Sequence, residues 1–192
     1  MNIIIIGMTG VGKTTIAKLL SRALDYNFAD IDKAIEDRCG VDIPTIFAIE
    51  GESGFRYRET EELSKVLLYT NYIISTGGGI VTRLENLDLM SKSNSVIIYL
   101  TADIKNIIRR VSYNIKKRPL LDQINLETNM KNIYNQRHHL YTQIANIIID
   151  TTDSNINKTV STIVKSLKEH LYIWLIMDIF VLIIKCNNIN WV

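Results

Sequence analysis

The sequence predicts an α/β domain, a doubly wound sheet of five parallel strands with helices on both faces. Short apolar runs alternate along the chain with segments whose apolar residues recur at helical spacing. The first run, Ile3–Ile6, is continuously apolar, as expected for a central strand that is covered on both faces of a parallel sheet. With 192 residues, 47% of them hydrophobic and 22% charged, the chain can bury a substantial core, and a disordered or collagen-like chain is excluded.

Five runs have the length of strands. We expect strands at Ile3–Ile6, Asn27–Asp30, Tyr72–Ser75, Ser95–Leu100 and Asn146–Ile149. The segments between them supply the crossover connections that parallel strands need.

Helical spacing is clearest in three segments, at residues 16–23, 104–111 and 156–167. Residues 113–128 break the rhythm, because they are polar and contain Pro119. Long connections of this kind are typical of active-site lids, and we expect a lid at about 113–124.

The first apolar run ends in a phosphate-binding motif. Residues 7–14, GMTGVGKT, fit G-x-x-x-x-G-K-[ST] between a predicted strand and a predicted helix. In such a P-loop the backbone amides surround phosphate oxygens, Lys13 would reach the β- and γ-phosphates, and the Thr14 hydroxyl would bind Mg²⁺. The motif predicts nucleotide binding, but it does not choose between a kinase, a GTPase, an ATPase motor and a transporter.

Two carboxylates follow at the end of the second predicted strand. Asp30 is placed to help hold the Mg²⁺ shell, and Asp32 to orient an acceptor hydroxyl and accept its proton. The alternative is structural, with Asp32 as the N-cap of the helix expected at Lys33–Arg38.

Two arginines indicate an acceptor that carries a carboxylate, which guanidinium groups bind bidentately. Arg56 has Glu59 three residues on, close enough on a helix to brace it. Arg137 lies on the helix expected after the lid and would complete a clamp. The alternative for Arg56 is an exposed arginine in an ordinary surface ion pair.

Two further features favour a kinase. Gly77–Gly79 follow a predicted strand and would let a ligand approach the backbone closely, or would simply form a tight turn. Arg118 lies in the predicted lid, from which an arginine can reach a transferring phosphate.

Taken together in this order, the motifs resemble the shikimate kinase family over residues 1–168. They are G-x-x-G-x-G-K-T, F-x-D-x-D, G-E-x-x-F-R-x-x-E, T-G-G-G, R-P-L-L and R-x-x-x-Y. The resemblance implies a fold of the nucleoside-monophosphate-kinase type. It also implies transfer of the ATP γ-phosphate to the 3-hydroxyl of shikimate, on the route to chorismate and the aromatic amino acids.

The resemblance also assigns residues. Catalytic roles fall to Lys13, Asp32 and Arg118, and Mg²⁺ to Thr14 and Asp30. The shikimate site comprises Asp32, Arg56, Gly78 through its backbone, and Arg137. The residues implied for ATP are Gly10, Val11, Gly12, Lys13, Thr14, Thr15, Arg110 and Arg118.

Two departures from the family pattern concern ATP. The segment between Arg110 and Arg118 is about one residue longer, and residues 150–155 lack the arginine that often covers adenine. Two alternative functions stay open, another small-molecule P-loop kinase such as a gluconate kinase, and a non-catalytic nucleotide-binding regulator.

The net charge, the two cysteines and the N-terminal segment limit which partners and which location we expect. A net charge of +2 gives no reason to expect nucleic-acid binding, and Cys39 and Cys186 read as free thiols. No secretory signal is recognised after Met1, so we expect a cytoplasmic enzyme. We place the catalytic domain at residues 1–169.

The apolar extension at 170–192 has no assigned role. Its apolar core, Leu171–Ile184, is 14 residues long with Asp178 inside, whereas a bilayer span needs about 20. We therefore expect no membrane anchor. The extension is expected to dock on this chain or on a second copy, and the alternative is a poorly packed tail without function. We expect a monomer, and copies that associate would do so through this extension.

Overall fold

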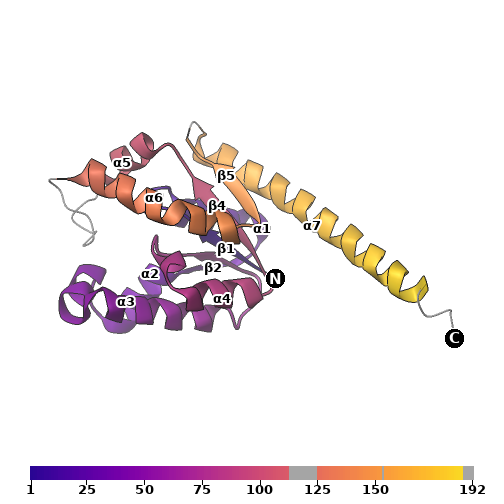
Figure 1. The fold of residues 1–192 in the computed structure, drawn as a ribbon, viewed down its shortest axis with the longest axis horizontal. Helices are drawn as coiled ribbons and strands as arrows, with labels where there is room; N and C mark the ends of the chain where they lie inside the picture. The colour runs from indigo at the N-terminus through magenta and orange to yellow at the C-terminus, as the bar shows by residue number, and fades with distance from the viewer. Residues whose placement is uncertain (113–124, 153, 188–192) are drawn as a thin grey trace.

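The computed structural model describes residues 1–112, 125–152 and 154–187, with side chains up to residue 173. One parallel sheet with strand order β2-β3-β1-β4-β5 forms its centre (Figure 1). The strands are β1 (Asn2–Ile6), β2 (Asn27–Asp30), β3 (Tyr72–Ser75), β4 (Ser95–Thr101) and β5 (Ile147–Asp150). The predicted parallel sheet of five strands is confirmed.

Helices connect the strands and cover the sheet. They are α1 (Lys13–Leu24), α2 (Ile31–Cys39), α3 (Ile43–Val66), the short 3₁₀ helix η1 (Ile80–Thr82), α4 (Leu84–Lys92), α5 (Ile104–Ser112), α6 (Leu126–Ile144) and α7 (Ile156–Asn187). All five residues of β1 are buried. Because successive side chains of a strand point to opposite faces, helices cover both faces there.

The last strand begins one residue later than predicted. Asn146 donates its backbone N–H to the carbonyl of Ile97 at 2.9 Å, and its side-chain oxygen accepts from the backbone N–H of Ile97 at 2.8 Å. The side chain thus substitutes for a backbone acceptor at the start of β5, which an apolar-run criterion does not detect. The end of the predicted connection at 113–128 is also wrong, since α6 begins at Leu126. The predicted lid at 113–124 lies outside the described residues.

The long helix α3 is two helical segments joined at a kink. Asp42 caps its start by accepting from the backbone N–H of Thr45 at 3.0 Å, and Pro44 occupies the first turn, where it removes no helix hydrogen bond. At Gly51 the backbone leaves helical geometry, with φ 68° and ψ −176°. The kink redirects the second segment, which carries Arg56 and Glu59.

Helix α7 packs on the sheet only through its first part. Thr159, Ile163 and Leu167 are buried, whereas Leu171–Ile173 are exposed. The helix then continues away from the rest of the molecule (Figure 1, yellow). Among the residues that the structure describes, no helix is long and apolar enough to cross a membrane.

Candidate active site

The predicted site residues gather at the carboxyl ends of three neighbouring strands. In the sheet register Ser75 at the end of β3 pairs with both Ile5 of β1 and Asp30 of β2. The P-loop follows β1, the two aspartates end β2 and start α2, and the glycine triplet Gly77–Gly79 follows β3. The carboxyl edge of an open parallel sheet is where such folds bind ligands.

The P-loop has the conformation that a phosphate cradle needs. Gly10 and Gly12 have φ angles of 85° and 103°, and a Cβ on Gly10 would lie 2.5 Å from Cγ2 of Val111. Gly12 is the N-cap of α1 and has no side chain to accept from the first amides of that helix. Those N–H groups and the positive end of the helix dipole therefore point at the loop.

Lys13 lies folded across this loop. Its Nζ donates to the carbonyls of Gly7 at 2.9 Å and Met8 at 3.0 Å, and the residue is buried. These bonds hold the ammonium group of Lys13 against the start of the loop.

Thr14 and Asp30 converge as predicted for a magnesium site. The Thr14 hydroxyl donates to Oδ2 of Asp30 at 2.7 Å and lies 3.3 Å from Oγ of Ser75. Mg²⁺ prefers oxygen ligands and is commonly held by one or two protein groups together with phosphate oxygens and water. Among the described residues, no group of three or more acidic, histidine or cysteine side chains is arranged so that it could hold a metal ion by itself. The donor set therefore suits an ion shared with a bound nucleotide.

The helix cap at this point belongs to Asp30, because its Oδ1 accepts from the backbone N–H of Lys33 at 3.1 Å. The structural alternative for Asp32, an N-cap role, is therefore wrong. Asp32 lies in the first turn of α2, and its carboxylate does not cap the helix.

Asp32 and Glu59 direct unpaired oxygens to one spot. Oδ1 of Asp32 and Oε1 of Glu59 are both buried and accept no hydrogen bond from the described residues. A Cβ on Gly77 would lie 2.8 Å from the first oxygen and 2.4 Å from the second. Burial, with the nearby Glu59 and Asp30 carboxylates, raises the pKa of Asp32 to about 7. Burial also raises the pKa of Glu59, although Arg56 opposes that shift.

Arg56 is buried against the glycine triplet, so the alternative of an exposed surface arginine is wrong. Its Nη1 donates to Glu59 at 2.9 Å, and its Nε and Nη2 donate to one oxygen of Glu52 at 3.3 and 3.1 Å. A Cβ on Gly79 would come within 2.2 Å of the guanidinium carbon. Only glycine at position 79 leaves room for Arg56.

The carbonyl of Gly78 joins the triplet to α6. It accepts from Nη1 of Arg137 at 3.1 Å and from the hydroxyl of Tyr141. On its other side Gly78 touches the P-loop, since a Cβ there would lie 3.0 Å from the backbone nitrogen of Thr9. The triplet also forms the tight turn considered from the sequence, with the N–H of Ile80 donating to Gly77 at 3.3 Å. The tight turn is therefore confirmed, and close approach of a ligand to this backbone stays a prediction.

Arg110 lies behind the P-loop, and Arg118 lies outside the described residues. The guanidinium of Arg110 donates to the carbonyls of Val11 and Thr151, both at 3.4 Å. It borders a cavity of about 270 Å³. The lining residues are Val11, Gly12, Thr15, Ile16, Arg110, Thr151, Ser154, Ile156 and Thr159. The half-exposed Ile156 gives this cavity an apolar surface. It directly follows residues 150–155, which lack the arginine that often covers adenine in the family.

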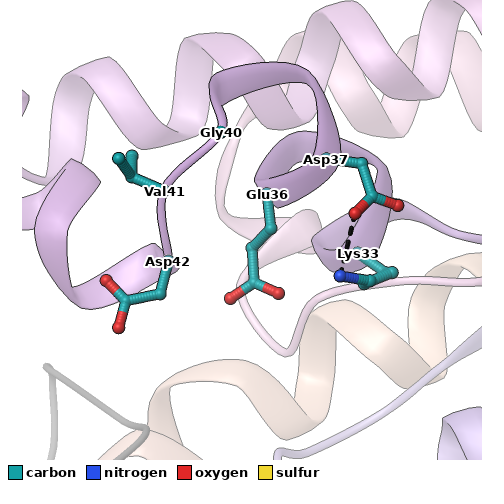
Figure 2. Close-up of a pocket in the computed structure, with 6 residues that line it drawn as sticks. All are labelled: Lys33, Glu36, Asp37, Gly40, Val41 and Asp42. Carbon is teal, nitrogen blue, oxygen red and sulfur yellow. Dashed lines mark ion pairs between the residues drawn. The ribbon is translucent and has the colours of Figure 1, made fainter.

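A second hollow, between α2 and α3, is not part of this site. Figure 2 shows Lys33, Glu36, Asp37 and Asp42 around it. Lys33 pairs with Asp37 at 2.8 Å, Glu36 accepts from the backbone N–H of Ile43 at 3.2 Å, and Asp42 caps α3. The Glu36 bond joins α2 to the start of α3, and the other groups are paired within α2 or cap α3, so the described residues around the hollow present no convergent set of free groups for a ligand.

Two residues in the site were missed by the sequence reasoning. Ser75 ends a strand and adds a hydroxyl beside Thr14, but a lone serine carries no distinguishing signal. Tyr141 appeared only as a letter of the R-x-x-x-Y motif, although its spacing of four from Arg137 places both on one helix face. That spacing was the available clue.

Comparison with known proteins decides the family. The family model for shikimate kinase matches residues 9–168. This chain belongs to the shikimate kinase family. A relative from Marinomonas sp. (strain MWYL1) named shikimate kinase is 38% identical over 172 residues, which cover 88% of this chain and 93% of the relative. One from Nitrosospira multiformis is 43% identical over 150 residues, covering 78% of this chain and 76% of the relative.

Solved structures of the family have the same fold. Shikimate kinase from Acinetobacter baumannii, determined in complex with shikimate, matches with a TM-score of 0.84 and 32% identity over 88% of this chain and 93% of that one. The enzyme from Aquifex aeolicus matches with a TM-score of 0.76 and 33% identity over 88% of this chain and 96% of that one. A gluconokinase from Sinorhizobium meliloti, 12% identical with a TM-score of 0.60 over 90% and 96% of the two chains, shares the fold alone.

Proposed function

We propose that this protein transfers the γ-phosphate of ATP to the 3-hydroxyl of shikimate, forming shikimate 3-phosphate on the route to chorismate and the aromatic amino acids. The observation that carries the proposal is the grouping of Arg56, Arg137 and Asp32 around the glycine triplet, next to the P-loop. Two cationic groups and one unpaired carboxylate suit an acceptor that carries both a carboxylate and hydroxyls.

On the donor side, residues 10–15 would bind the ATP phosphates through backbone amides and Lys13. Thr14 and Asp30 would hold Mg²⁺, which supplies charge neutralisation on the β- and γ-phosphate oxygens when it is bound. The cavity beside Arg110 and Ile156 would bind the adenine. The Ile156 side chain and the Arg110 guanidinium would contact the ring in place of the arginine that residues 150–155 lack. Arg118 would act on the phosphates from the 113–124 segment.

On the acceptor side, Arg56 and Arg137 would hold the shikimate carboxylate, and the backbone of Gly78 would contact the ring. The carboxylate of Asp32 accepts the proton of the 3-hydroxyl as the hydroxyl oxygen forms its bond to the γ-phosphorus. The bond from this phosphorus to the β,γ-bridging oxygen breaks, and ADP leaves with its electron pair. Lys13 compensates the charge that develops on the phosphate oxygens.

A coupled ADP-release assay tests the proposal with Mg²⁺–ATP and shikimate, gluconate or no acceptor. We expect release that depends on shikimate, with gluconate at the background rate. Lys13→Met should lose several orders of magnitude in turnover and serves as the catalytic control. ADP release with gluconate but not with shikimate would favour the other small-molecule kinase. The absence of ADP release with either acceptor would favour a regulator.

The role of Arg118 needs a test of its own, and Arg109 provides the matched control. Arg109 is exposed and lies beside Arg110. We expect Arg118→Ala to lower kcat at least a hundredfold, in line with other phosphate-directed arginines, and Arg109→Ala to change it less than threefold. Equal effects of the two substitutions would remove Arg118 from the site.

We also infer a monomeric, cytoplasmic enzyme whose catalytic domain ends near residue 169. The described groups assigned to shikimate and to the ATP phosphates lie together at the carboxyl ends of neighbouring strands, which supports one chain as the active unit. Light scattering of the purified protein at micromolar concentration should give the mass of one chain. A stable dimer would point to association through residues 170–192.

A further inference from the structure

The carbonyl of Gly78 has two donors from one helix. Nη1 of Arg137 donates to it at 3.1 Å, and the hydroxyl of Tyr141 donates to it as well. Arg137 and Tyr141 are four residues apart on α6 and therefore share a face. The proposed function assigns only one of these donors, Arg137, to the acceptor.

The two tasks of Arg137 compete. A guanidinium binds a carboxylate best through two parallel N–H groups, and a carbonyl that takes one of its N–H groups draws the plane away from that geometry. If Arg137 were the only donor, turning it to the acceptor would leave the half-buried Gly78 carbonyl without its partner, which is unfavourable. A second donor that stays in place removes this penalty.

Tyr141 is built to stay in place. Its side chain is fully buried and stacks on the ring of Tyr99 at a centroid distance of 5.0 Å. The hydroxyl of Tyr99 is in turn 2.9 Å from Nδ1 of His138, whose ring stacks on Tyr134. Burial raises the pKa of Tyr141, so its hydroxyl keeps its proton and remains a donor.

We propose that Tyr141 is a positioning residue for the acceptor site: its hydroxyl satisfies the Gly78 carbonyl and thereby releases Arg137 to bind the carboxylate of the acceptor. The inference rests on the proposed function. It makes Tyr141 act through Arg137, without touching the substrate itself.

The first test is Tyr141→Phe, which deletes the donor and keeps the ring. We expect Kd and KM for shikimate to rise about tenfold, with kcat within threefold and the Kd for ATP unchanged. Tyr99→Phe is the matched control. It also deletes a tyrosine hydroxyl from the stack of rings, but the hydroxyl of Tyr99 contacts His138 and not Gly78. It should change the Kd for shikimate less than twofold.

A double-mutant comparison separates positioning from a general structural role. In an Arg137→Ala background, Tyr141→Phe should change the Kd for shikimate less than twofold further, since there is no guanidinium left to release. An equal rise in both backgrounds, or an equal rise with Tyr99→Phe, would overturn the inference.

Replacement of Tyr141 by 4-aminophenylalanine keeps a donor at the same position and should restore affinity to within threefold of the wild type. This replacement also decides the case if Tyr141→Phe does not fold, because a folded 4-aminophenylalanine protein with tenfold weaker binding would contradict the proposal. Failure of the proposed function is recognised separately, because the wild-type protein would then not bind shikimate at all.

Discussion

Asp32 shows at the scale of one residue what packing adds to a motif. Its place in F-x-D-x-D predicted contact with an acceptor hydroxyl, but the sequence could not show the burial or the approach of Glu59 that, together with the neighbouring Asp30, raise its pKa. Glu59 was expected only as a brace for Arg56, and that ion pair is present at 2.9 Å. The convergence with Asp32 depends on Gly77, which lies between α2 and α3 in space and far from both in sequence.

The raised pKa predicts the pH dependence of activity. A proton acceptor must be ionised, and burial with two neighbouring carboxylates raises the pKa of Asp32 to about 7. The kcat/KM for shikimate should therefore fall about tenfold per pH unit below that value and level off above it. Asp32→Asn should lower the rate by several orders of magnitude and abolish this limb. A wild-type profile that is flat between pH 5 and 8 would remove Asp32 as the base.

Arg56 and Arg58 allow a matched comparison. Both lie on α3 and both pair with glutamates, but Arg56 contacts the glycine triplet whereas Arg58 pairs with Glu50 at the surface. Arg56→Ala should weaken shikimate binding by about 2–5 kcal/mol, because it removes one arm of a desolvated clamp. Arg58→Ala should weaken shikimate binding by less than about 1 kcal/mol, because a surface ion pair outside the site contributes little. Calorimetric titration checks both, and a selective loss of ATP affinity in Arg56→Ala would contradict the assignment.

At the scale of elements, most strands were predictable because each contains a short apolar run. The strand β2 has only Phe28 and Ala29 between two polar residues, yet it and β3 have the predicted limits. The start of β5 was not predictable, because Asn146 joins the sheet through its side chain. The kink of α3 depends on Gly51, whose positive φ becomes recognisable only when the two helical segments are seen packed. Apolar periodicity reports which face is buried, but not where a helix bends.

The turn after β3 yields an element-scale prediction. Gly79 has a φ of −101°, so alanine there meets no backbone strain, yet its Cβ would lie 2.2 Å from the Arg56 guanidinium carbon. We expect Gly79→Ala to displace Arg56 and to weaken shikimate binding at least tenfold, with ATP binding within twofold of the wild type. Fluorescence titrations with each ligand measure the split. Parallel losses for both ligands would show that the turn supports the whole site and not the acceptor half.

At the scale of the whole molecule, the sequence placed the P-loop, the two aspartates and the glycine triplet at strand ends, and these do lie at one edge of one sheet. Arg56 and Arg137 reach that edge from α3 and α6 through packing that the sequence does not show. The sequence could not predict what residues 170–192 pack against, because their apolar composition does not indicate a partner surface. The structure shows Leu167 as the last buried residue described on α7, and Leu171–Ile173 exposed.

This arrangement predicts that the extension is dispensable for catalysis. A chain ending at His170 keeps Ile163 and Leu167 in the core. It should retain kcat and KM within about twofold of the full chain and be more soluble, because exposed apolar surface promotes association. Steady-state kinetics and sedimentation of the two proteins provide the comparison. A truncated protein that is folded but inactive would place the extension within the catalytic machinery.

The product itself tests the central claim most directly. Shikimate, ATP and Mg²⁺ are incubated with the wild-type protein, and the phosphorylated product is examined by two-dimensional ³¹P–¹H NMR. We predict a single phosphate ester whose phosphorus couples to the proton on C3 of the ring, with Lys13→Met giving none. An ester on another hydroxyl, or no ester while ATP is consumed, would contradict the account.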